Sequence, residues 1–139
     1  MTRQLRPRVL LADDYPELVA AISEVLSLSC DVVGHVADGA ALLEAVTRLR
    51  PDVVVADVHL RGMNGLEACR HITQSPPHAA VVLVSAAADA EMRSLALAAG
   101  ACAFVSKYAI GDDLAAAVTQ AFETTRLDGR DPSASPSPT

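Results

Sequence analysis

Short apolar runs alternate along this chain with longer stretches in which apolar residues recur at helical spacing. Most of the short runs lack the polar alternation of a half-exposed strand, as expected when both faces of a strand are covered. The longer stretches place Leu, Val and Ile three or four positions apart, which is the spacing of a helix with one buried face. We therefore predict five strands, at residues 8–13, 31–36, 53–57, 79–85 and 101–105.

Five helices are predicted to follow these strands in turn. Pro16 suits the first turn of a helix, Asp38 is suited to cap the next one, and Gly100 suits a helix end. Such strict alternation predicts an α/β fold, a doubly wound parallel sheet between two helix layers with right-handed crossovers. The predicted helices span residues 16–28, 38–50, 65–74, 89–99 and 112–125.

Composition indicates a single compact domain. The chain has 139 residues, of which 51% are hydrophobic and 20% charged, so it can bury a core without being long enough for two. We assign residues 1–126 to this domain. Residues 127–139 are rich in Pro and Ser and lack apolar periodicity, so we interpret them as a disordered tail or a truncated linker.

Charge and cysteine content exclude several classes of function. With 17 acidic and 11 basic residues the net charge is −6, and no basic cluster lies outside the N-terminus, so we expect no direct nucleic-acid binding. No signal peptide or membrane-spanning run is visible, and a cytoplasmic protein without membrane contact is expected. Three widely spaced cysteines fit neither a zinc site nor a disulfide framework. We predict that Cys30, Cys69 and Cys102 are small buried residues in a reducing compartment.

Polar residues follow four of the five predicted strands. Strand one leads into Asp13 and Asp14, strand three into Asp57, strand four into Ser85, and strand five towards Lys107. Because the carboxyl ends of parallel strands meet at one edge, all five should face one another there. Three carboxylates together call for a hard divalent cation such as Mg²⁺, while a lysine and a hydroxyl would bind phosphoryl oxygens. The sequence therefore predicts a site for phosphoryl chemistry.

Each of these residues also has an ordinary explanation when it is taken alone. Asp13 and Asp14 could cap the helix that starts near Pro16, Asp57 could form a turn, and Lys107 could be a solvated side chain. The predicted convergence of all of them on one edge favours the functional interpretation.

These residues, together with the segment 51–67 that contains Met-Asn-Gly, resemble the receiver domains of bacterial two-component response regulators. Members of that family often precede a helix-turn-helix output domain. The resemblance extends over residues 8–122. It implies a flavodoxin-like three-layer sandwich with strand order 2-1-3-4-5.

The resemblance also implies how the site is used. Asp57 would be the phosphoacceptor, phosphorylated by a sensor histidine kinase. Mg²⁺, or Mn²⁺ in its place, would be held by Asp13, Asp14, Asp57 and the backbone carbonyl of His59. The chain would catalyse only its own phosphorylation and dephosphorylation, so it would not be an enzyme in the usual sense.

By the same likeness Ser85 is the switch hydroxyl, Lys107 pairs with the phosphate, and Phe104 is the aromatic residue that swings inward when the domain switches. The surface formed by helix four, strand five and helix five would then control a partner or output domain, with transcription as the expected output. A homodimer through that surface is also implied.

Two departures and three alternatives remain. Tyr108 stands where the family usually has proline, and nothing after Arg126 resembles a helix-turn-helix domain. An aspartate-nucleophile phosphatase or dehalogenase would normally carry a second acid at the position of His59. A flavodoxin-type electron carrier would need a hydroxyl-rich and glycine-rich loop after strand one. A degenerate receiver that serves only as a protein-binding module would need no phosphorylation.

Overall fold

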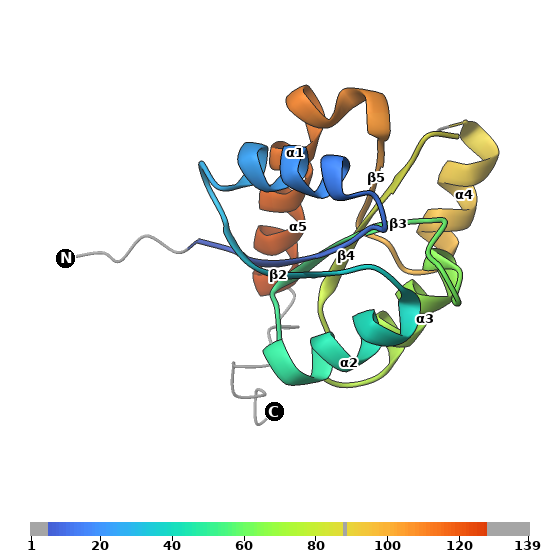
Figure 1. Cartoon of the computed structure of the whole chain (residues 1–139). Helices are drawn as coiled ribbons and strands as arrows, with labels where there is room; N and C mark the ends of the chain where they lie inside the picture. The colour runs from blue at the N-terminus through green and yellow to red at the C-terminus, as the bar shows by residue number, and fades with distance from the viewer. Residues whose placement is uncertain (1–5, 88, 128–139) are drawn as a thin grey trace.

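The computed structural model describes residues 6–87 and 89–127, with side chains up to residue 125. Its five strands form one parallel sheet in the order β2-β1-β3-β4-β5, which confirms the predicted fold class and strand order. Along the chain, a helix connects each strand to the following one (Figure 1). The strands are β1 (Arg8–Ala12), β2 (Asp31–Val36), β3 (Val53–Asp57), β4 (Ala80–Ser85) and β5 (Ala103–Ser106).

The helices cover both faces of the sheet, so the domain is a three-layer sandwich (Figure 1). Residues of α1 and α5 pack in the core on one face, and residues of α2, α3 and α4 pack in the core on the other. Every residue of β3 and β4 is buried, which explains why these strands are continuous apolar runs. The helices are α1 (Pro16–Leu26), α2 (Gly39–Leu49), α3 (Gly65–Gln74), α4 (Ala90–Ala98) and α5 (Ala115–Leu127).

The first predicted strand and helix were each too long at their carboxyl ends. The strand ends at Ala12 rather than Asp13, and α1 ends at Leu26 rather than Leu28. The backbone N–H groups of Ser29 and Cys30 both donate to the carbonyl of Leu26, which turns the chain, and the side chain of Leu28 is 85% exposed.

The region around the last strand differs most from the prediction. Gly100, at a φ of 104°, follows α4 in the left-handed conformation, and β5 begins two residues later than predicted. A 3₁₀ turn (Lys107–Ala109) and a π turn (Ile110–Leu114) then precede α5, so Asp112 does not start the helix. Ile110 and Leu114 are buried, which holds these turns against the core.

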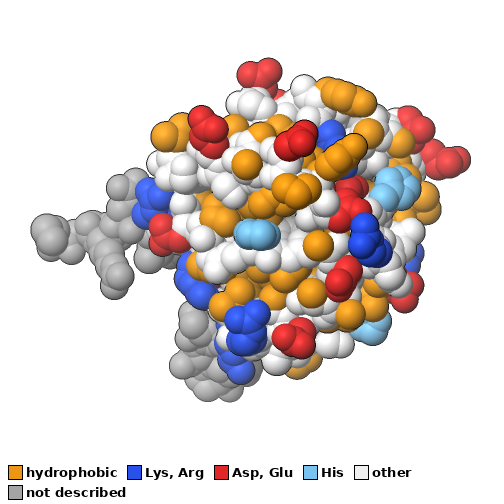
Figure 2. Space-filling model, viewed as in Figure 1, with side chains coloured by type: hydrophobic (Ala, Val, Ile, Leu, Met, Phe, Trp, Pro, Cys, Tyr) orange, Lys and Arg blue, Asp and Glu red, His pale blue; other side chains and the backbone are white. Residues whose placement is uncertain are grey.

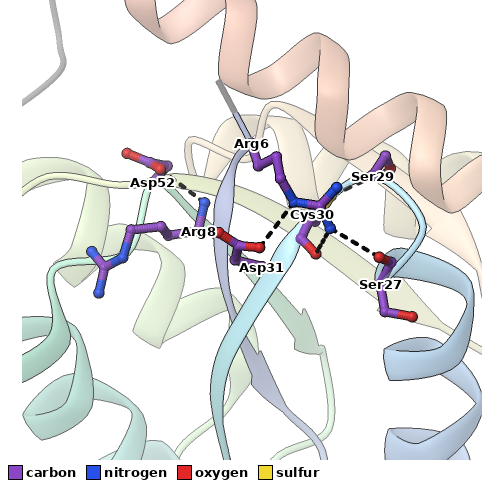
Figure 3. Close-up of polar contacts among 7 residues, drawn as sticks. All are labelled: Arg6, Arg8, Ser27, Ser29, Cys30, Asp31 and Asp52. Carbon is purple, nitrogen blue, oxygen red and sulfur yellow. Dashed lines mark hydrogen bonds and ion pairs between the residues drawn. The ribbon is translucent and has the colours of Figure 1, made fainter. Parts of the chain in front are cut away.

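At the amino-terminal end of the sheet, two arginines hold neighbouring segments together (Figure 3). The guanidinium of Arg6 donates to the carbonyl oxygens of Ser27 and Cys30 and to the carboxylate of Asp31, each at 2.9 Å. The backbone N–H of Arg8 donates to Asp52 at 2.8 Å. Arg6 thereby satisfies carbonyls left free beyond the end of α1.

Several remaining predictions can be compared with the structure. Cys30 and Cys69 are buried as predicted, but the prediction was wrong for Cys102, which is exposed where the chain enters β5. Among the described residues the one cis peptide bond joins Pro76 and Pro77. Residues 128–139, most of the predicted tail, lie outside the described part of the chain. No helix within that part is long and apolar enough to cross a membrane.

Candidate functional site

Three aspartates meet at the carboxyl end of the sheet, as the sequence predicted. Asp13 and Asp14 follow β1, and Asp57 is the last residue of the neighbouring strand β3. One carboxylate oxygen from each lies within 4.8 Å of the others. Figure 2 shows acidic and basic side chains together at the right of the view, over the ends of β1 and β3. Asp13 and Asp57 are each 5% exposed, whereas Asp14 faces solvent.

Asp57 has a defined partner on each carboxylate oxygen. Oδ2 accepts a hydrogen bond from the ammonium of Lys107 at 2.8 Å, and Oδ1 accepts one from the backbone N–H of His59 at 3.0 Å. The lysine reaches across from the turn after β5, 50 residues away in the chain. This buried carboxylate is therefore fixed in orientation by its own strand end and by a distant cation.

Asp13 is held by the turn that follows it and carries an unfavourable charge. Its Oδ1 accepts the backbone N–H of Tyr15 at 2.8 Å, and Lys107 lies 3.6 Å from its Oδ2. Burial raises the pKa of Asp13 above its usual value, and this outweighs the opposing effects of the Tyr15 N–H and of Lys107. The cap residue of α1 is Tyr15, whose side chain makes no capping bond, so the simple helix-cap explanation of Asp13 fails.

Lys107 is the cation of this cluster. Burial by itself lowers its pKa, but the hydrogen bond and charge of Asp57 and the charge of Asp13 outweigh that effect, so the pKa of Lys107 is raised. The side chain is 20% exposed. The ammonium therefore stays charged at neutral pH and faces both buried carboxylates.

The loop between β3 and α3, residues 58–64, passes close to Asp57, the predicted phosphoacceptor. The backbone N–H of Gly65 donates to the carbonyl of Val58 at 2.7 Å. A Cβ on Gly65 would collide with the carbonyl oxygen of Asp57 and lie 2.8 Å from the Cα of Val58. Glycine at this position therefore allows α3 to begin directly against the end of β3.

Ser85 and Phe104 lie close to the sheet end but are shielded from solvent. Ser85 ends β4, is fully buried, and accepts the backbone N–H of Ala87 on its Oγ at 3.1 Å. Phe104 is 4% exposed within the core beneath α4, and the guanidinium carbon of Arg93 lies 5.7 Å from its ring centroid. The switch roles assigned to both residues stay predictions.

The arrangement of donors fits a divalent cation. Three carboxylates lie close together beside a single ammonium, that of Lys107, so the cluster carries excess negative charge. Burial makes this charge unfavourable, as the raised pKa of Asp13 indicates. Exposed Asp14 borders a groove of about 420 Å³ whose opposite wall is formed by residues 58–64, leaving room for the waters that Mg²⁺ retains. The carbonyl ligand predicted at His59 belongs to this same wall.

Sequence reasoning missed what supports that wall. The N-terminus of α2 lies against it, since the backbone N–H of Gly39 donates to the carbonyl of Arg61 at 3.1 Å and Asp38 forms an isolated parallel bridge with Arg61. Periodicity could not have found this contact, because it joins the N-terminus of α2 to a loop more than twenty residues further along the chain. Glycine directly after a cap residue was the one available signal.

A comparison with known families decides the identity of the domain. The response regulator receiver domain profile matches residues 9–119, which is most of the chain. The chain belongs to this family. The family match favours the receiver interpretation over both the hydrolase and the electron-carrier alternatives.

Individual relatives agree with the family match. The receiver is 35% identical over 103 residues to the DNA-binding response regulator MtrA of Mycolicibacterium smegmatis, covering 74% of this chain and 45% of that protein. It is 31% identical over 123 residues to the nitrate/nitrite response regulator NarL of Escherichia coli, covering 87% of this chain and 57% of that protein. The chain thus spans about half the length of these curated relatives.

A solved structure shows the same fold. The receiver domain of the putative response regulator NarL from Mycobacterium tuberculosis has a TM-score of 0.74 and 30% identity, covering 91% of this chain and 98% of that one. Other relatives are named protein-glutamate methylesterases, of which this receiver covers between 24% and 41%. Relatives of this receiver thus include proteins that are named as enzymes.

Proposed function

We propose that this receiver accepts a phosphoryl group on Asp57 from the phosphohistidine of a sensor kinase. A carboxylate oxygen of Asp57 forms a bond to phosphorus while the bond from phosphorus to the donor nitrogen breaks. The nitrogen keeps the bonding electron pair, and because the other ring nitrogen of the phosphohistidine carries a proton, the products are an acyl phosphate and a neutral histidine. The observation that carries this proposal is the buried carboxylate of Asp57, held 2.8 Å from Lys107 within a cluster of three aspartates.

The surrounding residues supply the electrostatics of the transfer. The ammonium of Lys107 lies 2.8 Å from the carboxylate of Asp57 and 3.6 Å from that of Asp13. It is therefore close enough to move its hydrogen bond from Oδ2 of Asp57 to an oxygen of a phosphoryl group bound there. Asp13, Asp14, Asp57 and the carbonyl of His59 would hold Mg²⁺, or Mn²⁺ in its place. The cation would supply the positive charge that offsets the phosphoryl oxygens as they approach three carboxylates.

We assign the response to phosphorylation to Ser85 and Phe104. Ser85 is the last residue of β4, which pairs with β3, the strand that ends in Asp57. Its hydroxyl can donate a hydrogen bond to a phosphoryl oxygen. A contact made only in the phosphorylated state shifts the balance between two arrangements of the β4–α4 region. Phe104, one strand further along, would follow that shift.

The outcome we propose is control of a transcriptional output, since several relatives and structural neighbours are named as DNA-binding or LuxR-family regulators. The surface of α4, β5 and α5 carries Leu95 and Leu97, which are 42% and 50% exposed. A phosphorylation-dependent homodimer through this surface is part of the proposal. Sedimentation of the chain with and without phosphorylation tests it, and a monomer under both conditions contradicts it.

Intact mass after incubation with acetyl phosphate and MgCl₂ tests the central step. We expect a gain of about 80 Da on the wild type that requires the metal. The adduct should be absent from Asp57→Asn and present on the control Asp31→Asn, which alters an aspartate at the opposite end of the sheet. A wild type that gains no mass would instead indicate a receiver that acts only as a binding module.

A further inference from the structure

The groove beside the acidic cluster has two walls of different origin. Asp14 forms one wall, and the loop of residues 58–64 forms the other. Asp14 lies two residues beyond β1, an interior strand of the sheet. The loop has no strand or helix of its own, so whatever holds it sets the width of the groove.

The two ends of this loop are fixed by its own neighbours. The backbone N–H of Val58 donates to the carbonyl of Val84 in β4, and Gly65 begins α3 with a hydrogen bond to the carbonyl of Val58. Between these two points, the middle of the loop contacts a third element. There the carbonyl of Arg61 accepts the N–H of Gly39, the first residue of α2.

Gly39 is fitted closely against this loop. A Cβ at position 39 would collide with the Cβ of Met63 and would lie 3.1 Å from its Cγ and 3.2 Å from its Cα. A Cβ cannot rotate away from such a contact, so the backbone of the loop or of the helix would have to move. Asp38, whose side chain caps α2 through the N–H of Ala41 at 2.7 Å, fixes the helix end.

We propose that the N-terminus of α2, through Gly39, positions the loop between β3 and α3 and thereby sets the affinity of the acidic cluster for its divalent cation. The proposal rests on the metal-dependent function proposed above. Gly39 acts here as a positioning residue, because it touches neither the cation nor the phosphoryl group. Its effect passes through Arg61 and Met63 to the wall that carries His59.

Gly39→Ala is the direct test, with Mg²⁺ affinity read from an NMR titration of the backbone amides of Asp14 and Tyr15. We expect the dissociation constant for Mg²⁺ to rise about tenfold, the lower end of the losses seen when groups that orient metal ligands are altered. Gly34→Ala is the matched control. A Cβ there meets only the flexible ends of two leucine side chains, Leu49 of α2 at 3.3 Å and Leu10 of β1 at 3.7 Å, so affinity should stay within about twofold.

Met63 supplies the second half of the test. Met63→Gly removes the Cβ and Cγ that a residue at position 39 would strike, whereas Met63→Ala keeps the Cβ. The effect of Gly39→Ala, measured within each background, should fall to about twofold with Met63→Gly and persist at about tenfold with Met63→Ala. This pattern separates contact through the loop from a general loss of helix stability.

Two results would overturn the proposal. One is a Gly39→Ala protein with lowered thermal stability but unchanged Mg²⁺ affinity, which would assign Gly39 a packing role alone. The other is an equal effect of Gly39→Ala in both Met63 backgrounds. Should Gly39→Ala fail to fold, Met63→Gly alone should weaken Mg²⁺ binding at least threefold relative to Met63→Ala, and no difference between them would refute it.

Failure of the proposed function would be visible separately. It would appear in the wild type itself, as absence of Mg²⁺ binding or of the mass adduct on Asp57. A wild type that binds Mg²⁺ and gains the adduct, beside a Gly39→Ala protein with unchanged affinity, would reject the role of Gly39 alone.

Discussion

Aspartates and basic side chains are placed at both ends of the sheet, but the balance between them differs. At the amino-terminal end, Arg6 pairs with Asp31 with both side chains largely exposed, and Asp52 accepts a backbone N–H (Figure 3). At the carboxyl end, three carboxylates cluster beside Lys107, which pairs with Asp13 and Asp57, and these two aspartates are almost fully buried.

The difference shows which end is built for stability and which for chemistry. An exposed pair in which each charge has a partner contributes little and changes little with conditions. Buried carboxylates in excess of cations raise the free energy of the folded state, and a divalent cation or a phosphoryl transfer can relieve or exploit that excess. The raised pKa of Asp13 is the physical mark of the second case.

Removal of the shared cation should have the largest effect on stability. Lys107→Met leaves Asp13 and Asp57 buried without a counter-charge, and we expect the free energy of unfolding without metal to fall by about 2 kcal/mol at pH 8. Because the pKa of Lys107 is raised, its contribution is complete below pH 10.5 and is lost as the pH rises through the folded-state value. Urea unfolding of both proteins between pH 8 and pH 12 checks this. Equal stability at pH 8 would contradict it.

Removal of one buried carboxylate should have the opposite sign. Because the pKa of Asp13 is raised in the folded protein, its ionisation destabilises the fold at pH values above its ordinary pKa of 3.8. Asp13→Asn should therefore increase the free energy of unfolding by about 1 kcal/mol at pH 7 without metal. The gain should shrink as the pH falls and the wild-type carboxyl protonates.

The same variant should lose the increase in melting temperature that MgCl₂ gives the wild type. Melting curves with and without MgCl₂ measure both effects. Asp31→Asn is the control at the opposite end and should change stability by less than about 0.5 kcal/mol. A destabilised Asp13→Asn protein would show that the carboxylate is satisfied rather than in excess.

A smaller effect is expected at the amino-terminal end. Arg6→Ala removes the donor to the carbonyls of Ser27 and Cys30, which water can replace at this exposed site, so stability should fall by about 0.5 to 1 kcal/mol. Mg²⁺ affinity should be unchanged within error, because the two ends of the sheet are independent. A shift in Mg²⁺ affinity would show that the two ends of the sheet are coupled.

The smallest effects concern the thiols. Burial raises the pKa of Cys69 to about 12 and also raises that of Cys30, even with Arg6 nearby. We expect one thiol, the exposed Cys102, to react quickly with a disulfide reagent at pH 8, and the other two only on unfolding. Neutral Cys69 stabilises the fold below pH 9, and this contribution is lost as the pH rises towards 12. Mass spectrometry of the labelled peptides identifies the thiols, and rapid labelling of Cys30 would contradict the prediction.

Local errors in the prediction have different causes. The first helix was predicted to run to Leu28, yet it ends at Leu26, whose carbonyl accepts the backbone N–H groups of Ser29 and Cys30. The last helix was predicted to begin at Asp112, yet a π turn spans Ile110–Leu114 there, with Ile110 and Leu114 buried in the core. Cys102 was counted as buried by composition alone. Of these errors, only the one at the start of the last helix is linked to tertiary packing, because local backbone hydrogen bonds make the turn after Leu26.

The sequence by itself determined the order of strands and helices, the parallel sheet, and the set of residues at its carboxyl end. It could do so because these depend on periodicity and on the rule that parallel strands end at one edge. Only the tertiary structure decided that Lys107 contacts both Asp13 and Asp57, and that Gly39 holds the loop after β3. Those facts depend on distances between segments far apart in the chain, and burial, which raises the pKa of Asp13, exists only once these segments are packed together.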